Sequence, residues 1–315
     1  ETAAGTLTRE QAKEYISCFW IKVNNHPAPP KVGITAKESG TYNDFTNINI
    51  GGVKRDGTSG ESEVSYILLE VLGELHILQP GCSVHVSEKT SDDLVKAACK
   101  VIRLGYGYPS LFNPDTYVRE LVRQGKSLED AREGGCSGCI EVGAFGKEAY
   151  LLTGYLNVPK LLELALNNGI DPLTGRQISI ATGDAREFRT FEDLYAAFLK
   201  QLEYVVLEKI KVNNYIDRMF AEYAPATFLS VLIDDCIAKG KDYYNCGPRY
   251  NTNYIQCTGL GTVTDAMSSI KKHVFEEGRY TMDRMLEMLK ADFKGHEFDR
   301  QWIINHTSFF GNDDE

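Results

Sequence analysis

The chain has 315 residues, of which 43% are hydrophobic and 25% charged, so it can bury a large core as one big domain or two smaller ones. Its formal net charge of -10 argues against a nucleic acid or an anionic membrane as partner. No apolar run approaches the roughly 20 residues that span a bilayer, and no signal peptide opens the chain. We therefore expect a cytoplasmic protein whose 8 cysteines are free thiols.

Capping residues followed by apolar residues at helical spacing predict a series of helices. A capping-box pattern with Thr8 and Gln11 comes first, and an apolar helical face then covers residues 64–75. Asn113 and Asn157 each stand just before a proline in the first turn of a predicted helix. Further helices are expected after Ser91, over residues 191–210 and after Thr281.

Short strand candidates lie between these helices. They cover residues 47–51, 83–86, 140–142 and 254–257. Helices that alternate with short strands predict an α/β fold, built as a barrel or a wide sheet. No internal repeat and no shift in composition marks a linker, so one domain is the simpler interpretation.

The stretch Gly134–Gly143 carries the strongest chemical signal. It places Cys136, Cys139 and Glu141 among four glycines. Glycines allow backbone conformations that push a thiol out at the tip of a turn, and a carboxylate at the second residue after Cys139 points to the same side on extended backbone. A sulfur and an acid/base group presented together on a loop indicate an active site.

Other interpretations of the two cysteines stay open on the pattern alone. Cys136 and Cys139 have the spacing of a redox pair, of half a zinc site, or of two buried thiols. A zinc site would need a second pair at similar spacing, whereas the other cysteines and the histidines are scattered singly. No metal site is therefore expected.

The motif and its flanks resemble the glycyl radical enzymes, the superfamily of pyruvate formate-lyase. The resemblance covers almost the whole chain, and it rests on the shared order and spacing of several short segments. These segments include Ile50-Gly51-Gly52, residues 103–109, Glu129-Asp130-Ala131-Arg132, Gly138-Cys139-Ile140-Glu141, Arg249-Tyr250-Asn251 and residues 311–314.

The resemblance implies a fold and a pair of catalytic residues. The fold would be an α/β fold, part of a ten-stranded α/β barrel with a central cysteine loop and helices outside. Cys139 would carry a thiyl radical, Glu141 would act as general acid or base, and Cys136 would be a bystander. A radical formed beside the substrate must be shielded from solvent and oxygen, which a loop inside a barrel provides.

The resemblance also implies what this chain lacks. The family's glycine radical motif is found nowhere in the sequence, and the first part of the family's barrel is missing. We therefore expect residues 1–315 to be the central portion of one pyruvate formate-lyase-like domain, inactive alone. No cofactor would bind to this portion; an organic glycyl radical would sit on a residue outside it. A radical-SAM activating enzyme would install that radical, and homodimers are common in the family.

Residues around the motif resemble the branch that contains trans-4-hydroxyproline dehydratases and arylacetate decarboxylases. The segment after Glu141 and the segment 39–45 carry this likeness. They imply a substrate pocket lined by Ser39, Asp44, Phe45 and Tyr155, in which the carboxylate of Asp44 would pair with a ring ammonium.

The expected reaction is therefore the dehydration of trans-4-hydroxy-L-proline to pyrroline-5-carboxylate. The alternatives are radical decarboxylation of an arylacetate or carbon–sulfur cleavage by the same kind of site, because small pocket changes redirect the chemistry of one fold. A non-catalytic protein or a redox protein that uses both cysteines is the alternative from a different class.

Overall fold

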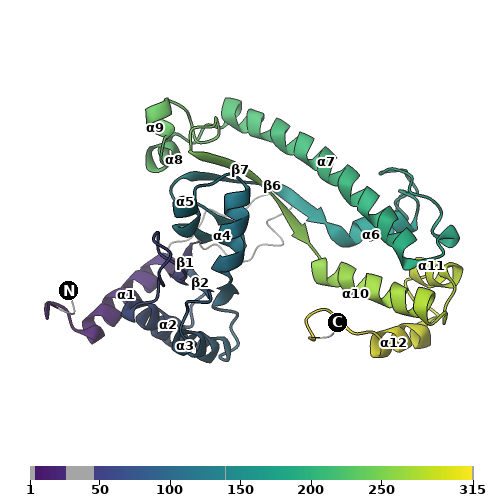
Figure 1. Ribbon diagram of the computed structural model, residues 1–315, viewed down its shortest axis with the longest axis horizontal. Helices are drawn as coiled ribbons and strands as arrows, with labels where there is room; N and C mark the ends of the chain where they lie inside the picture. Colours follow the sequence, from purple (N-terminus) through teal and green to yellow (C-terminus); the bar gives the residue numbers. More distant parts are fainter. Residues whose placement is uncertain (1–3, 26–45, 139, 314–315) are drawn as a thin grey trace. The chain divides into compact units, whose positions relative to one another are not determined.

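The computed structural model describes residues 4–25, 46–138 and 140–313 (Figure 1). Contacts divide the chain into two compact units. The first unit comprises residues 1–150 and 226–252, and the second comprises residues 151–225 and 253–315. Among the described residues no helix is both long and apolar enough to cross a membrane.

The first unit is built on a three-stranded parallel sheet in the order β1-β2-β3, with the strands β1 (Asn47–Gly51), β2 (Gly81–His85) and β3 (Ser110–Phe112). The crossovers are the helices α2 (Glu63–Leu75) and α3 (Asp92–Ile102). Parallel strands need such crossovers, and the middle strand β2 is buried at every position, as expected for a covered parallel sheet.

Apolar residues from the sheet and both crossover helices form the main core of this unit. Leu72 on α2, Val84 on β2 and Leu94 on α3 are almost completely buried within it. Trp20 anchors the helix α1 in a neighbouring cluster with Ile67 and Val71 of α2. The remaining helices of the unit are α1 (Arg9–Asn24), α4 (Pro114–Arg123), α5 (Leu128–Arg132), α8 (Thr227–Leu232) and α9 (Cys236–Lys239).

A two-stranded sheet of β6 (Glu148–Asn157) and β7 (Tyr250–Thr258) contributes residues to both units. The second unit has its own core, in which Leu161, Leu194 and Met288 are fully or almost fully buried. Its helices are α6 (Val158–Leu166), α7 (Phe191–Tyr223), α10 (Leu260–Ile270), α11 (Met282–Lys290) and α12 (Glu297–His306). A π-helical turn, Lys271–Glu276, follows α10.

The predicted caps are confirmed. Thr8 and Gln11 form the capping box of α1, and the side chains of Ser91, Asn113, Asn157 and Thr281 cap α3, α4, α6 and α11. A side-chain oxygen at the N-cap satisfies backbone N–H groups that a helix start leaves open, so the signal is local and readable.

Several predicted bounds need correction. The strand predicted over 83–86 begins two residues earlier as β2, the strand predicted over 140–142 is Glu141–Gly143, and the strand predicted over 254–257 is the longer β7. The helix predicted to stop at residue 210 continues to Tyr223 as α7, and the strands β3, β4 (Gly135–Ser137) and β6 were not predicted. The mixed α/β class is confirmed, although no sheet formed by the described residues closes into a barrel.

Candidate active site

The motif around Cys136 folds as a hairpin in the first unit. The strands β4 (Gly135–Ser137) and β5 (Glu141–Gly143) pair antiparallel, with Ser137 opposite Glu141 next to the connecting turn. Residues 138–140 connect the strands, so Cys139 stands at the tip in the sequence; its own placement lies outside the described residues. We call residues 134–143 the cysteine loop.

Glu141 is the first residue of β5 and is half-buried. Its Oε2 accepts a hydrogen bond from the backbone N–H of Ile140 at 3.1 Å. The carboxylate therefore turns back toward the tip of the loop instead of pointing along the strand. This orientation keeps an acid/base group beside the segment that carries Cys139.

Two asparagines of β1 bind the other strand of the loop. Asn49 Oδ1 accepts from the N–H of Cys136 at 2.9 Å, and Asn49 Nδ2 donates to the carbonyl of Cys136 at 3.0 Å. Asn47 Nδ2 donates to the same carbonyl at 3.3 Å and to the carbonyl of Gly138 at 3.4 Å. The loop is thus tied to the parallel sheet by side-chain amides.

A buried ion pair holds the residues that follow β5. Lys126 Nζ lies 3.0 Å from Glu148 Oε1, and the side chains are 2% and 0% exposed. Glu148 Oε2 accepts from the N–H of Ala144 at 2.7 Å, and its Oε1 accepts from the hydroxyl of Thr252. A buried carboxylate is stable when several donors satisfy it, so this cluster fixes the end of the loop.

A second charged cluster surrounds Asp130, on the short helix just before the loop. Its carboxylate accepts from Lys147 at 2.7 Å, from the Tyr250 hydroxyl at 2.8 Å and from Arg249 at 3.2 Å. Burial by itself would raise the pKa of Asp130, but the hydrogen bonds from Lys147, Tyr250 and Arg249 outweigh it and hold the pKa well below its usual range. Arg249 and Tyr250 thus hold α5, the helix that ends just before the cysteine loop.

A neutral histidine lies at the end of β2. His85 is 3% exposed, its Nδ1 is 2.9 Å from the hydroxyl of Tyr117, and its ring stacks on Phe112. Desolvation by burial lowers the pKa of His85 to about 4, so the ring is uncharged at neutral pH. His85 therefore packs against Phe112 and hydrogen-bonds to Tyr117 as an uncharged ring.

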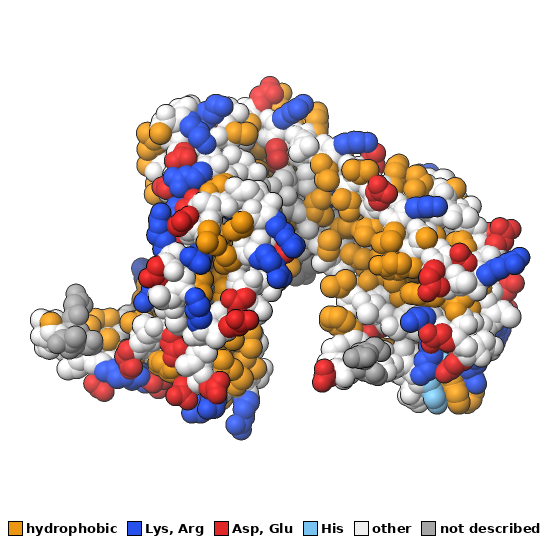
Figure 2. Space-filling view, in the orientation of Figure 1, with side chains coloured by type: hydrophobic (Ala, Val, Ile, Leu, Met, Phe, Trp, Pro, Cys, Tyr) orange, Lys and Arg blue, Asp and Glu red, His pale blue; other side chains and the backbone are white. Residues whose placement is uncertain are grey.

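The predicted site residues fall into three groups. Cys139, Ser39, Asp44 and Phe45 lie outside the described residues, so their roles stay predictions. Glu141 belongs to the first unit, and Tyr155, on β6, belongs to the second. The side chain of Tyr155 is 63% exposed. Figure 2 shows hydrophobic side chains gathered over β6 and α7.

Cys136, predicted to be a bystander, is fully buried. Its sulfur lies 3.9 Å from the carbonyl of Ser137. Among the described residues no group of three or more His, Cys, Asp or Glu side chains could hold a metal ion.

The sequence interpretation missed four residues that hold the loop, namely Asn47, Asn49, Lys126 and Glu148. A signal for Asn49 was present, because Asn47 and Asn49 alternate with Ile48 and Ile50 and so form a polar stripe on one face of a predicted strand. Lys126 and Glu148 carry no such signal, since their pairing depends on segments that meet through folding.

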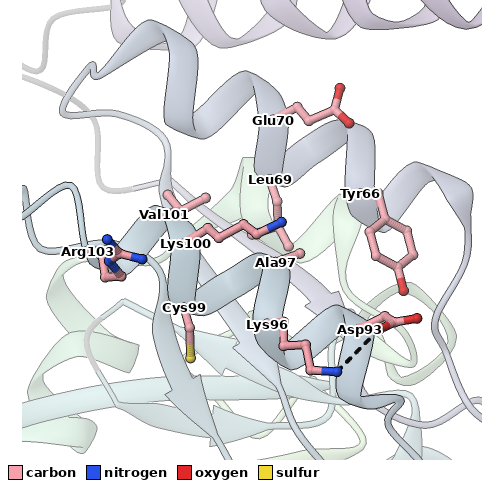
Figure 3. A pocket seen from close by; sticks show the side chains of 10 residues that line it. All are labelled: Tyr66, Leu69, Glu70, Asp93, Lys96, Ala97, Cys99, Lys100, Val101 and Arg103. Atoms are coloured by element: carbon pink, nitrogen blue, oxygen red, sulfur yellow. Dashed lines mark ion pairs between the residues drawn. The ribbon is translucent and has the colours of Figure 1, made fainter.

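A surface cavity of about 640 Å³ lies elsewhere in the first unit, between α2 and α3 (Figure 3). The buried Leu69 and Val101 contribute apolar surface to it, and Lys96 and Asp93 pair at 3.6 Å among its charged lining residues. The described residues predicted for the active site do not line this cavity, so it is separate from the cysteine loop.

Comparison with known proteins places the chain in context. A family model described as pyruvate formate lyase-like matches residues 1–315. The trans-4-hydroxy-L-proline dehydratase of Clostridioides difficile is 50% identical over 311 residues, which are 99% of this chain and 39% of the dehydratase. The (2S)-3-sulfopropanediol dehydratase of Klebsiella oxytoca is 31% identical over 314 residues, 98% of this chain and 38% of that protein.

A solved structure agrees with these relatives. The crystal structure of the hydroxyproline dehydratase of Clostridioides difficile with trans-4-hydroxy-L-proline bound superimposes with a TM-score of 0.90 at 50% identity. The superposition covers 99% of this chain and 40% of that structure's chain. The chain therefore has the fold of the matching part of these proteins and spans about two fifths of their length.

Proposed function

The chain belongs to the pyruvate formate lyase-like family, and from this membership we propose that it is the central part of a glycyl radical lyase that dehydrates trans-4-hydroxy-L-proline. The observation that carries the proposal is the 50% identity to a trans-4-hydroxy-L-proline dehydratase over 99% of the chain, against 31% for the sulfopropanediol dehydratase. Residues 1–315 would form part of a ten-stranded α/β barrel around the cysteine loop.

In this proposal Cys139 is the residue that exchanges hydrogen with the substrate. A thiyl radical on Cys139 removes a hydrogen atom from the ring carbon beside the nitrogen. The hydroxyl then leaves the neighbouring carbon as water, and the Cys139 thiol returns the hydrogen atom. The net change is the loss of one water, which leaves an imine and regenerates the thiyl radical. A glycyl radical outside this chain, installed by a radical-SAM activating enzyme, supplies the unpaired electron.

Glu141 would give the departing hydroxyl its proton. The hairpin supports this role, because Glu141 begins β5 two residues after Cys139 and its carboxylate turns to the tip of the loop through the N–H of Ile140. A positioned carboxyl group that transfers a proton in the transition state accelerates a reaction about 10²- to 10⁴-fold.

Four residues would bind the substrate. Asp44 would pair with the ring ammonium, Phe45 would contact the apolar face of the ring, and Ser39 and Tyr155 would complete the lining. A charge-assisted hydrogen bond to a desolvated ammonium favours a cyclic amine over an uncharged arylacetate ring. This difference separates the dehydratase from the decarboxylase of the same family.

The test is an anaerobic product assay with the full-length, activated enzyme. It is given trans-4-hydroxy-L-proline or 4-hydroxyphenylacetate, and mass spectrometry follows pyrroline-5-carboxylate and released carbon dioxide. We expect the imine from hydroxyproline and no carbon dioxide from the arylacetate. Carbon dioxide from the arylacetate, with hydroxyproline left unconsumed, would identify a decarboxylase instead.

Two cysteine variants test the assignment of the radical residue. Cys139→Ala should abolish turnover, whereas Cys136→Ser should keep most of it, because Cys136 is buried in β4 and is not the proposed radical carrier. The opposite pattern, with activity lost in Cys136→Ser and kept in Cys139→Ala, would support a redox protein.

A further inference from the structure

Side chains of β1 form hydrogen bonds with the backbone of β4. The side-chain amide of Asn49 hydrogen-bonds to both backbone groups of Cys136. It accepts from the N–H at 2.9 Å and donates to the carbonyl at 3.0 Å. A side-chain amide has the same donor and acceptor as a peptide group. Asn49 therefore pairs with the backbone of Cys136 in the way that a peptide group of a neighbouring strand would.

The register of the hairpin explains why Cys136 is available for this contact. Cys136 stands opposite Val142, and its N–H and carbonyl both bond to the side chain of Asn49. Gly135 makes room for the contact, because a Cβ at Gly135 would lie 2.8 Å from Asn49 Oδ1 and from the ring of Phe145. Contacts between non-bonded atoms at such a distance are repulsive, so the glycine and the asparagine fit as a pair.

Asn47 extends the contact toward the tip. Its Nδ2 lies 3.4 Å from the carbonyl of Gly138, the residue before Cys139, and 3.1 Å from Ser83 Oγ on β2. Asn47 and Asn49 share one face of β1, because residues two apart in a strand point to the same side. Since β1 is paired along its length with the buried strand β2, both amides are held by a rigid element.

We propose that Asn49, assisted by Asn47, is a positioning residue that fixes the cysteine loop on β1 and so sets the place of the Cys139 thiol relative to the reacting C–H bond. This inference rests on the proposed function of Cys139. Hydrogen transfer needs the reacting atoms in contact, and a misplacement of about 1 Å costs on the order of 10²-fold in rate.

The decisive measurement is turnover per radical combined with an isotope effect. Asn49→Ala and Asn47→Ala are made in the full-length enzyme, and the radical is counted by electron paramagnetic resonance. The substrate carries deuterium on the ring carbon between the nitrogen and the carbon that bears the hydroxyl. Asn49→Ala should lower kcat per radical about 10- to 100-fold with little change in KM. The deuterium effect on kcat should rise, because hydrogen abstraction becomes slower relative to the other steps. Asn47→Ala, which loses longer hydrogen bonds, should show a smaller effect.

The matched control is Asn168→Ala in the second unit. The Oδ1 of Asn168 accepts from the N–H groups of Thr182 and Gly183, both at 2.8 Å, so this asparagine also holds a loop by its side chain. Its loss should lower stability and leave kcat per radical and the isotope effect unchanged. The isotope effect does not depend on the folded fraction, so a variant that folds poorly still gives an answer.

Hydrogen exchange of the peptide that contains residues 134–143 provides a readout apart from activity. Asn49→Ala should speed exchange of the cysteine loop, and Asn168→Ala should not. Unchanged exchange together with unchanged kcat per radical in Asn49→Ala would overturn the inference. If the loop loses protection while the parent enzyme leaves hydroxyproline unconsumed, the positioning role stands and the proposed substrate is wrong.

Discussion

At the scale of single residues, Glu141 combines a structural contact with the proposed chemistry. Its Oε2 accepts the N–H of Ile140, which fixes the carboxylate at the tip of the cysteine loop. A carbonyl oxygen can accept this hydrogen bond as well as a carboxylate oxygen can, whereas only the carboxyl group can transfer a proton. The two roles can therefore be separated by one substitution.

We predict that Glu141→Gln lowers kcat about 10²- to 10⁴-fold, because the amide keeps the acceptor for Ile140 and removes the proton donor. The radical content and the urea midpoint should stay close to those of the parent enzyme. Glu133→Gln is the matched control, since Glu133 pairs with Lys147 at 2.7 Å outside the loop and should retain activity. Full activity in Glu141→Gln would remove this carboxyl group from the mechanism.

At the scale of elements, the cysteine loop depends on close approach of its two strands. A Cβ on Gly134 would lie 2.1 Å from the carbonyl oxygen of Gly143 and 3.0 Å from its carbonyl carbon. These neighbours are backbone atoms of the paired strand, so they cannot move aside without opening the hairpin. Position 134 therefore has no room for a side chain, and only glycine fits there.

We predict that Gly134→Ala destabilises the protein by about 1–3 kcal/mol and strongly reduces turnover per radical, because the added methyl group separates β4 from β5. Gly73→Ala is the matched control. Gly73 lies inside α2, where the nearest atom to a new Cβ is 3.6 Å away, so the same change should stabilise by about 0.5–1 kcal/mol. Urea denaturation measures both; equal stability of the two variants would contradict the clash.

Asp130 makes a prediction about pH. The pKa of this carboxyl group is lowered in the folded protein despite burial, because Lys147, Tyr250 and Arg249 donate to it. A group with a depressed folded pKa adds stability that is fully present above its unfolded pKa, about 3.9 for an aspartate, and that is lost as the pH falls through the folded pKa.

The Asp130→Asn variant should therefore be less stable than the parent by about 2 kcal/mol from pH 5 to 8, since hydrogen bonds to a charged group are lost. The difference should shrink steadily as the pH falls below about 4, because the carboxylate of the unfolded parent takes up a proton there while the folded one is still ionised. Urea denaturation across this pH range checks the sign. A gap that widens on acidification would show that Asp130 is not held as a carboxylate.

The comparison of sequence and structure separates local signals from distant ones. Helix starts at Thr8, Ser91 and Asn157 were predicted because each cap bonds its own first turn. The last part of α7 was missed because polar residues there interrupt the apolar face, yet Asn213 donates to Asn253 Oδ1 on β7 at 3.0 Å. The strand β6 was missed because its partner β7 lies about a hundred residues further along the chain.

The candidate site shows the same division. Cys139 and Glu141 were found because a short motif carries both, and the role of each remains a prediction. Asn49 stands in a polar stripe that the sequence shows, but its partner Cys136 lies far away along the chain, and the pairing of Lys126 with Glu148 has no local signal. A short local motif thus points to candidate residues, whereas the contacts that hold the loop join segments distant in the sequence.

At the scale of the whole molecule, the chain forms two compact units with separate apolar cores. Leu72 belongs to the core of the first unit and is 1% exposed, and Met288 belongs to the core of the second and is fully buried. Truncating a buried side chain of this size costs about 2–5 kcal/mol. Because the two clusters share no residue, each loss should stay within its own unit.

We predict that Leu72→Ala speeds amide hydrogen exchange at least about 10-fold in α2 and α3 and leaves α6 and α11 unchanged, while Met288→Ala does the reverse. Peptide-resolved hydrogen exchange of the full protein measures both, and the double variant should combine the two effects within about 0.5 kcal/mol. Protection lost in both units from either single truncation would mean that the cores open together as one cooperative body. In that case a change at Met288 would also disturb the parallel sheet that carries Asn49, and hence the cysteine loop.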